Sequence, residues 1–324
     1  MDIQNSRRRL SFVLRPLLLA ALLLAALQPA SAEPLIILSQ NMNRLFDDID
    51  DGNREKILSR TEFRRRVVQA VRKFAENYSM PQIIALQEVE NLNVLQQIAA
   101  RIREQHEIDY QLVLLPGQDP SGINLGFMVQ SGIVIRNRQQ LFRERKLPFD
   151  GSHLFSRPPL HLEVCYQSRC LSLLNLHLRS MRGIDSPDKG ERVARKRLRQ
   201  AEMIAVWINR YQQIEADTAL LVLGDFNALT PADQRVDVAG IILGNPDNTR
   251  ARMKSRDLLD PDLIDLTRQI PAPQRYSYIF RQKRQQLDYM FASQSLARRL
   301  EGISFGAIDY SFSDHAGLLA RYEW

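Results

Sequence analysis

The sequence has few cysteines: two in 324 residues, Cys165 and Cys170. So small a set argues against a structural zinc site, which needs four ligands. The two cysteines flank four residues between two largely apolar runs, 160–164 and 171–176, a pattern typical of a β-hairpin. Opposed positions across a short hairpin are close enough for a disulfide, and we predict this bridge for an exported chain.

The sequence also lacks an internal repeat and a low-complexity tract, so a repeat architecture is not expected. Apolar residues make up 44% of the chain and charged residues 25%. This composition is enough to build a sizeable core and argues against global disorder.

The one long apolar run lies in the first 32 residues. Arginines precede a Leu/Ala stretch from Leu17 to Leu27, and Ala30-Ser31-Ala32 supplies the small residues of a cleavage site. The stretch is too short for a comfortable membrane span. We predict a secretory signal peptide at 1–32 and a catalytic domain at 33–324, exported to the periplasm or the medium, with no stable membrane association after cleavage.

The net charge decides little. The signal peptide carries +3 of the chain's formal +7, which leaves about +4 for the mature chain. A basic balance attracts polyanions such as nucleic acid or anionic membranes, but a solvated surface explains an excess this small equally well.

Three apolar strands end in polar side chains that suit a site. The run 220–223 is followed by Gly224, Asp225 and Asn227, and the run 82–86 is followed by Glu88. The first mature strand, 34–38, leads to Asn41. An isolated Gly-Asp-x-Asn is as well explained by a turn that closes a strand. Two acids at the ends of different strands are a better metal candidate than either acid alone.

Three further segments place titratable groups near strands. The strand 171–176 leads to His177, Asp288 lies inside the apolar run 286–291, and Asp314-His315 precede the last strand at 317–322. A lone histidine is usually structural or exposed. A buried aspartate is costly unless it is paired or hydrogen-bonded.

The remaining pattern alternates helices and strands. Helical spacing of apolar residues, beginning with Ile57, predicts surface helices over 54–78, 92–102 and 192–211. We expect strands at 110–115, 123–129 and 133–136, an irregular span after residue 230, and a hairpin that pairs 276–280 with 286–291.

Taken together, these motifs resemble the endonuclease/exonuclease/phosphatase superfamily, which includes DNase I, AP endonucleases, bacterial sphingomyelinases and inositol polyphosphate phosphatases. The resemblance covers about residues 35–322 and is greatest for a secreted bacterial nuclease-like branch. The motifs occur in the family's order: Asn41 in Gln-Asn-Met-Asn, Glu88 in Leu-Gln-Glu-Val, His177 in Asn-Leu-His-Leu, Asp225 and Asn227 in Gly-Asp-Phe-Asn, Asp288 in Leu-Asp-Tyr, and Asp314 and His315 in Ser-Asp-His.

The resemblance implies an α/β fold, a four-layer sandwich of two packed mixed or antiparallel sheets flanked by helices. It implies hydrolysis of a phosphate ester by in-line attack of water, with Mg²⁺, or Mn²⁺ or Ca²⁺, as cofactor. The metal site would comprise Glu88, Asn41 and Asp314, and Asp288 would orient His315. Asp225 would align or deprotonate the water, while Asn227 and His177 donate to phosphate oxygens. Whether Asp225 or His315 takes the proton stays open.

The leading functional hypothesis is an exported nuclease, acting as a monomer on DNA or RNA. One departure weighs against it, because Ser121 stands where the branch usually has an arginine. The alternatives are a phosphodiesterase for phospholipids or inositol phosphates, for which the sequence shows no exposed aromatic hairpin, and a non-catalytic binding protein on the same fold. No motif for reading bases is present, so no sequence specificity is expected.

Overall fold

The computed structural model describes residues 33–52, 56–167, 169–215, 219–229, 233 and 235–324. The predicted signal peptide, residues 1–32, lies outside the described residues. The account below concerns the compact unit Leu35–Trp324.

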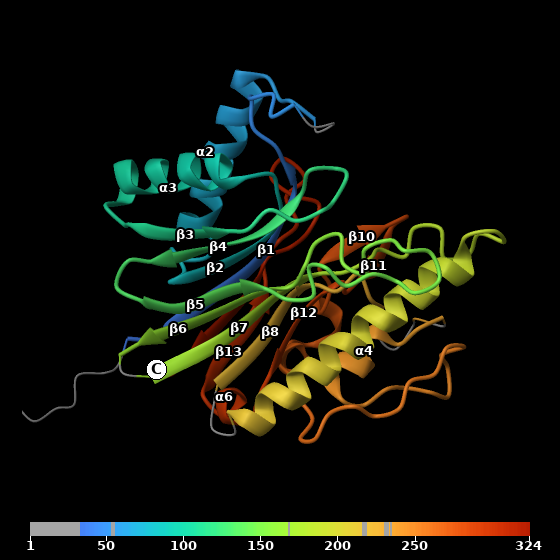
Figure 1. Ribbon diagram of the computed structural model, residues 1–324. Coiled ribbons are helices and arrows are strands. Elements are labelled where there is room, and N and C mark those ends of the chain that lie inside the picture. Colours follow the sequence, from blue (N-terminus) through green and yellow to red (C-terminus); the bar gives the residue numbers. More distant parts are fainter. Residues whose placement is uncertain (1–32, 53–55, 168, 216–218, 230–232, 234) are drawn as a thin grey trace, which may run out of the picture. The chain divides into compact units, whose positions relative to one another are not determined.

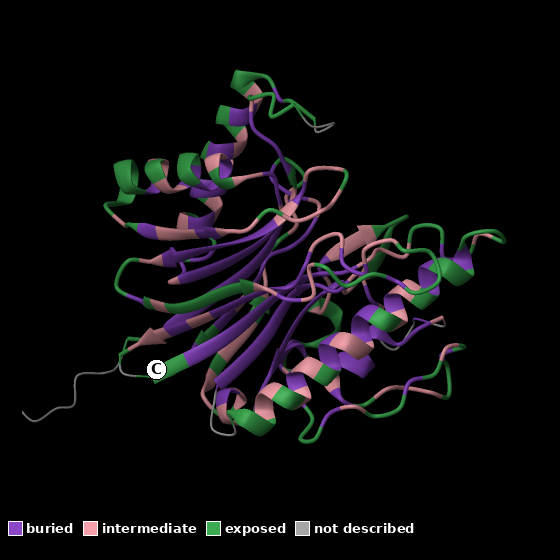
Figure 2. Ribbon diagram, viewed as in Figure 1, coloured by how far each residue is buried: buried purple, intermediate pink, exposed green. Residues whose placement is uncertain are grey.

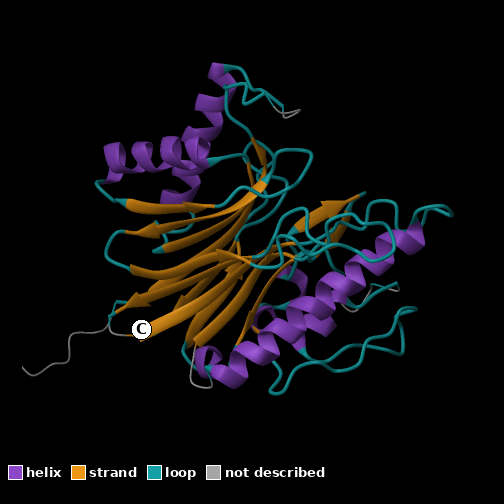
Figure 3. Cartoon of the chain, viewed as in Figure 1, coloured by secondary structure: helices purple, strands orange, loops and turns teal. Residues whose placement is uncertain are grey.

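Two six-stranded sheets pack face to face, and helices cover both outer faces (Figures 1 and 3). In spatial order, the first sheet contains β13 (Leu300–Phe305), β14 (Leu318–Tyr322), β1 (Leu35–Leu45), β2 (Ile83–Val89), β4 (Asn124–Gln130) and β3 (Tyr110–Leu114). The second contains β5 (Val134–Gln140), β6 (Leu160–Tyr166), β7 (Arg169–His177), β8 (Ala219–Asp225), β12 (Asp288–Ala292) and β9 (Ile264–Asp265).

Both sheets are mixed, because β1 runs parallel to β2 and β7 runs parallel to β8, whereas the other pairs are antiparallel. The helices are α2 (Arg60–Glu76), α3 (Leu92–His106), α4 (Gly190–Ile214), α5 (Val238–Leu243) and α6 (Gln294–Ala297), with 3₁₀ turns η1 (Leu266–Gln269) and η2 (Ala272–Gln274). The predicted four-layer α/β sandwich is confirmed.

Strand alternation builds three apolar layers. In β8, Leu221 and Leu223 point between the sheets, whereas Leu220 and Val222 point toward α4 and α5. The first sheet likewise separates the central layer from a third, which includes the inward faces of α2 and α3. Strands with both faces covered need apolar residues at every position, which explains the unbroken apolar runs of the sequence (Figure 2).

The cysteine hairpin is confirmed. Cys165 on β6 lies opposite Cys170 on β7, and their sulfurs form a disulfide.

Three parts of the chain differ from the secondary structure expected from the sequence. The first helix begins at Arg60, because Ser59 caps it by accepting a hydrogen bond from the Glu62 amide, so Ile57 precedes the helix and is 47% exposed. The region after residue 230, expected to be irregular, contains α5, β9 and the two 3₁₀ turns. β13 occupies a stretch for which no strand was expected.

The predicted hairpin of 276–280 with 286–291 is wrong. β10 (Tyr278–Phe280) pairs with β11 (Lys283–Gln285), whereas β12 pairs with β8 and β9. A tight turn at Arg281 and Gln282, both with positive φ, joins β10 to β11. This closer pairing leaves the longer apolar run free to enter the large sheet.

No helix within the described ranges is both long and apolar enough to cross a membrane.

Candidate active site

The ends of three neighbouring strands place three predicted site residues in one row. In the parallel pair β7 and β8, His177 lies opposite Asp225. In the antiparallel pair β8 and β12, Asp225 lies opposite Asp288. This register brings together residues that lie up to 111 positions apart in the chain.

Gly224 makes this close arrangement possible. Its φ is +126°, and a Cβ atom at this position would lie 2.1 Å from the Leu176 carbonyl oxygen on β7. Only glycine fits there, which explains the residue that precedes Asp225.

The first sheet supplies Asn41 and Glu88. The pairing of β2 with β4 shifts between Gln87 and Val89, and Glu88 has a φ of +59°. This irregularity redirects the Glu88 side chain at the strand end. A left-handed conformation in a non-glycine residue is costly, and such residues are common at functional sites.

Asn41 connects the acids of the two sheets. Its Nδ2 donates to Glu88 Oε1 at 3.2 Å and to Asp225 Oδ2 at 3.1 Å. Its Oδ1 accepts the Asn43 backbone N–H at 2.9 Å, so the amide nitrogen faces the carboxylates.

His177 is buried against the same two carboxylates. Its Nε2 lies 3.7 Å from Glu88 Oε1 and 3.5 Å from Asp225 Oδ2. Burial, followed by the charges of Arg157 and His315, lowers the pKa of His177 well below its ordinary value. We conclude that His177 is neutral at neutral pH.

Asp288 and His315 form a buried pair, with Asp288 Oδ2 2.7 Å from His315 Nδ1. Burial by itself would lower the pKa of His315, but attraction to Asp288 and its hydrogen bond, with smaller contributions from Asp225 and Asp314, raise it to about 10. The imidazole is therefore a cation at neutral pH.

Two serines hold this pair in place. Ser277 Oγ accepts the Leu287 and Asp288 amides at 3.0 and 3.1 Å, while Ser313 Oγ accepts the His315 amide at 3.0 Å and donates to the Asn41 carbonyl at 2.7 Å. The ring of Tyr278 lies 5.0 Å from that of His315. Ser313 is the first residue of the Ser-Asp-His motif but was not expected to have a role, and no pattern in the sequence identified Ser277 or Tyr278.

The acids around His315 also surround Asp225, where they disfavour the charged form. Burial, and then repulsion by Asp288 and Glu88, raise its pKa to about 7, although attraction to His315 acts against the shift. Asp225 can therefore change protonation state near neutral pH.

Asn227 lies next to Asp225 in the left-handed region, with a φ of +50°. Its backbone N–H donates to Asp225 Oδ1 at 2.8 Å, and its Nδ2 donates to the Leu178 carbonyl at 3.3 Å. The second bond turns the amide toward the end of β7.

A buried arginine supports the loops that follow β7 and β8. Arg197 on α4 donates to the carbonyls of Arg179 and Asn227 at 2.6 and 2.8 Å, and it pairs with Asp233 at 2.7 Å. A second buried network joins the sheets, with Gln87 Nε2 donating to Asn175 Oδ1 at 2.8 Å. Gln87 and Asn175 lie within the motifs Leu-Gln-Glu-Val and Asn-Leu-His-Leu, but no role was expected for them or for Arg197, because each network depends on partners that are distant in the chain.

A cleft of about 970 Å³ opens over these residues, and its lining includes Glu88, His177, Asp225, Asn227, Asp314 and His315. Five basic residues also line it: Arg44, Arg157, Arg179, Arg182 and Lys196. Ser121, which stands where the branch usually has an arginine, contacts a residue of the cleft lining. Its hydroxyl and its amide both donate to Asp119 Oδ1, and Asp119 pairs with Arg157 at 2.6 Å.

The residues present suit a divalent cation. Ligand atoms of Glu88, His177 and Asp225 lie within 4.8 Å of one another, and Asp314 lines the same cleft. Carboxylate oxygens are the ligands that Mg²⁺ and Ca²⁺ prefer, and a cation here would relieve the repulsion between the acids.

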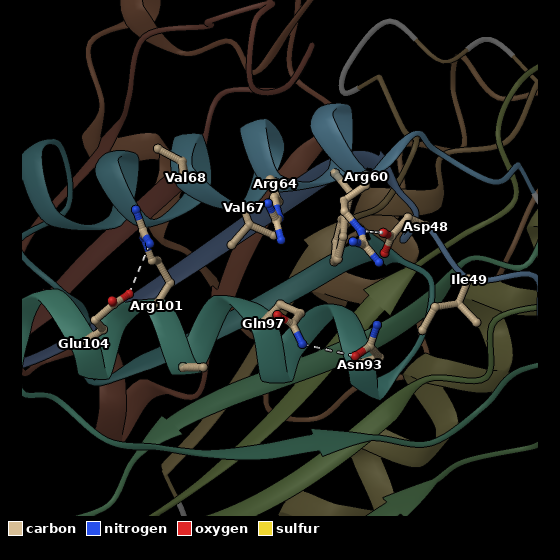
Figure 4. Close-up of a pocket in the computed structure, with 12 residues that line it drawn as sticks. Asp48, Ile49, Arg60, Arg64, Val67, Val68, Asn93, Gln97, Arg101 and Glu104 are labelled. Atoms are coloured by element: carbon tan, nitrogen blue, oxygen red, sulfur yellow. Dashed lines mark hydrogen bonds and ion pairs between the residues drawn. The ribbon is translucent and has the colours of Figure 1, made fainter.

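A second cavity, of about 810 Å³, lies between α2 and α3 (Figure 4). Its ion pairs, Arg60 with Asp48 and Arg101 with Glu104, join partly exposed side chains. None of the predicted site residues lines this cavity.

Solved structures share the fold over most of their length. A humanized TDP2 from D. rerio is 16% identical, with a TM-score of 0.56 over 89% of this chain and 98% of that one. An endonuclease/exonuclease/phosphatase from Bacteroides vulgatus is 14% identical, with a TM-score of 0.56 over 89% and 98%. The 3′ phosphatase NExo from Neisseria, bound to a product DNA hairpin, is 18% identical, with a TM-score of 0.55 over 90% and 100%.

No curated protein matches the sequence. The sequence profile of the Endonuclease/Exonuclease/phosphatase family matches residues 38–315, most of the chain and all eight predicted site residues. The chain therefore belongs to the Endonuclease/Exonuclease/phosphatase family.

Proposed function

We propose that this protein is a divalent-metal-dependent phosphodiesterase that hydrolyses nucleic acid, with DNA as the first substrate to test. One observation carries the proposal: a single cleft lined by basic residues contains an acid with a pKa near 7, an imidazolium and carboxylates that suit a cation. The acid is Asp225 and the imidazolium is His315.

Glu88 and Asp314 are the proposed metal ligands. A bound cation would neutralise charge on a phosphate oxygen and on the leaving oxygen. The resemblance implies that Asn41 binds the metal. We instead propose that Asn41 links Glu88 to Asp225 by hydrogen bonds, because its amide nitrogen faces both carboxylates.

Asp225 is the proposed general base. With a pKa near 7 it can accept a proton from water, whereas His315 is already protonated and lacks the free electron pair. Held by Asp288, His315 would donate a hydrogen bond to the phosphate as negative charge develops. The Asn227 amide and the neutral His177 ring would supply further donors.

The choice of nucleic acid is supported by the cations of the cleft and by the fold. A D. rerio TDP2 of the same fold, 17% identical, has been solved with a single-strand DNA product, and NExo with a product DNA hairpin. Export by a cleaved signal peptide and action as a monomer remain part of this proposal.

Phospholipid hydrolysis is the second candidate. Phe280, on the β10–β11 hairpin at the cleft, is 49% exposed, so the chain does present an aromatic side chain that the sequence pattern did not reveal. An exposed aromatic beside a cleft is compatible with contact to a membrane surface.

The test is nicking of supercoiled plasmid by protein from Glu33 onward, with Mg²⁺ or with EDTA, beside His315→Ala. Metal-dependent nicking that the variant loses would support a nuclease and exclude a contaminant. Intact plasmid with Mg²⁺, Mn²⁺ and Ca²⁺, together with hydrolysis of phosphatidylcholine or sphingomyelin vesicles, would instead favour the second candidate.

A further inference from the structure

Three of the five basic residues of the cleft lie on the wall formed by the end of β7 and the start of α4. Arg179 follows His177 by two residues, Arg182 lies in the next loop, and Lys196 lies on α4. All three line the cleft that contains the predicted catalytic residues.

No ion pair within 4 Å joins these three cations to a carboxylate among the described residues, and three acids near the cleft pair with other arginines. Asp119 pairs with Arg157 at 2.6 Å, Asp150 with Arg192 at 2.5 Å, and Asp185 with Arg235 at 3.7 Å. The wall therefore has unneutralised positive charge.

The charges also repel one another. Burial, followed by Arg157, Arg197 and Arg182, lowers the pKa of Arg179. Burial and Arg179 are the two largest causes that lower the pKa of Lys196, while attraction to Asp150 acts against them. Holding like charges together costs folding energy, and an anion bound between them would relieve the repulsion.

Their hydrogen bonds fix these side chains and leave donors available. Arg179 donates to Ser180 Oγ at 2.8 Å and to the Arg182 carbonyl at 3.1 Å, while Lys196 Nζ donates to the His153 carbonyl at 2.7 Å. An ammonium group has three donors, so two remain on Lys196 within the described structure.

We propose that Arg179, Arg182 and Lys196 bind a second phosphate of the substrate, next to the phosphate that is cleaved. Arg179 follows the end of β7 at His177 by two residues, and two residues of backbone reach at most about 7 Å. This reach is on the scale of the spacing between successive phosphates of a nucleic-acid strand. The subsite would favour a polynucleotide over a substrate with one phosphodiester, and this inference rests on the proposed function.

Binding measured without cleavage tests the subsite directly. The probe is a fluorescent twelve-nucleotide single-stranded DNA in EDTA, titrated from 50 to 200 mM salt against the wild type and the double variant Arg179→Gln/Lys196→Gln. We expect the variant to bind at least about tenfold more weakly, with the slope of log K against log salt reduced in magnitude by about 0.7, because each phosphate contact contributes about 0.7 for single strands.

Arg192→Gln is the matched control, since Arg192 is an exposed arginine of the same helix that pairs with Asp150 and does not line the cleft. It should bind within about twofold of the wild type. Melting temperatures of all variants establish that each is folded. A double variant with wild-type affinity and salt slope would overturn the proposal.

Cleavage distinguishes this inference from the proposed function. With Mg²⁺, kcat/KM of the double variant should fall at least about tenfold more for the oligonucleotide than for bis(p-nitrophenyl) phosphate, which has one phosphate. Equal falls would refute the subsite while the phosphodiesterase stands. If the wild type cleaves neither substrate, the proposed function fails, and the binding assay still decides the subsite. Charge-dependent binding to phosphatidylglycerol vesicles without binding to DNA would also overturn the proposal.

Discussion

Asp225 and His315 are buried in one cluster, yet their pKa values shift for different reasons. For Asp225, burial and neighbouring acids make the charged form unfavourable. For His315, contact with Asp288 outweighs the cost of burial. The same crowding of acids therefore produces a candidate base at Asp225 and a cation at His315.

Asp225→Asn should stabilise the metal-free protein more at pH 7 than at pH 5. The pKa of Asp225 is raised from 3.8 to about 7 on folding, so the folded state holds the proton more tightly than the unfolded chain does. Ionisation of Asp225 therefore lowers the free energy of unfolding of the wild type as pH rises from about 4 to about 7. Asparagine cannot ionise, so the variant does not undergo this loss.

Urea unfolding in EDTA should show a gain for Asp225→Asn that is about 2 kcal/mol larger at pH 7 than at pH 5. His315 also makes the free energy of unfolding depend on pH, because the unfolded imidazole titrates near 6.5, but both proteins have this residue and its contribution largely cancels in the comparison. A gain that does not vary with pH would contradict the raised pKa.

Asp288→Asn should lower kcat by about 10²–10⁴, because an amide cannot stabilise the His315 cation and can hold the ring in the wrong tautomer. Steady-state kinetics on whichever phosphodiester the wild type cleaves would measure this. The exposed Glu301→Gln is the control and should leave kcat unchanged. A kcat for Asp288→Asn within threefold of the wild type would exclude an essential role for the pair.

At the scale of elements, backbone irregularities position the site residues. β8 can lie against β7 because Gly224 has no side chain, and the shift in register at the end of β2 redirects Glu88. Sequence pattern located both strand ends correctly. It did not indicate the left-handed conformation of Glu88, since only a neighbouring strand reveals the irregular pairing.

Gly224→Ala should destabilise the fold by about 2–4 kcal/mol, since its φ of +126° and the contact with Leu176 both disfavour a Cβ atom. Gly302→Ala on β13 is the matched control, because a Cβ there meets nothing within 4 Å, and its effect should stay within about 0.5 kcal/mol. Urea unfolding compares the two, and similar small losses would show that β7 and β8 can separate slightly at no cost.

At the scale of the whole molecule, the site joins the two sheets. Asn41 and Glu88 belong to the first sheet, whereas His177, Asp225 and Asp288 belong to the second. A ligand held by this cluster would therefore stabilise the packing of one sheet on the other.

Mg²⁺ at about 100 times its Kd should raise the stability of the domain by about 2.7 kcal/mol, measured as a melting temperature higher by several degrees. Glu88→Gln should abolish most of this rise, and Glu301→Gln should retain it. The measurement does not require activity. An equal rise in all three proteins would place the cation elsewhere.

The sequence by itself determined most of the strands, the three long helices and the polar residues that follow the strands. These features are local, because a strand buried on both faces requires a continuous apolar run and an amphipathic helix requires its own period. The family's motifs then gave the expected roles of Glu88, Asp225 and His315.

Only the tertiary structure decided which of these residues meet, and how. The bridging orientation of Asn41, the pairing of β10 with β11, the buried Arg197 and the basic wall of the cleft all depend on groups that are distant in the chain. The physical reason is that pKa values, hydrogen-bond direction and unpaired charge depend on three-dimensional neighbours, which packing of the two sheets brings together.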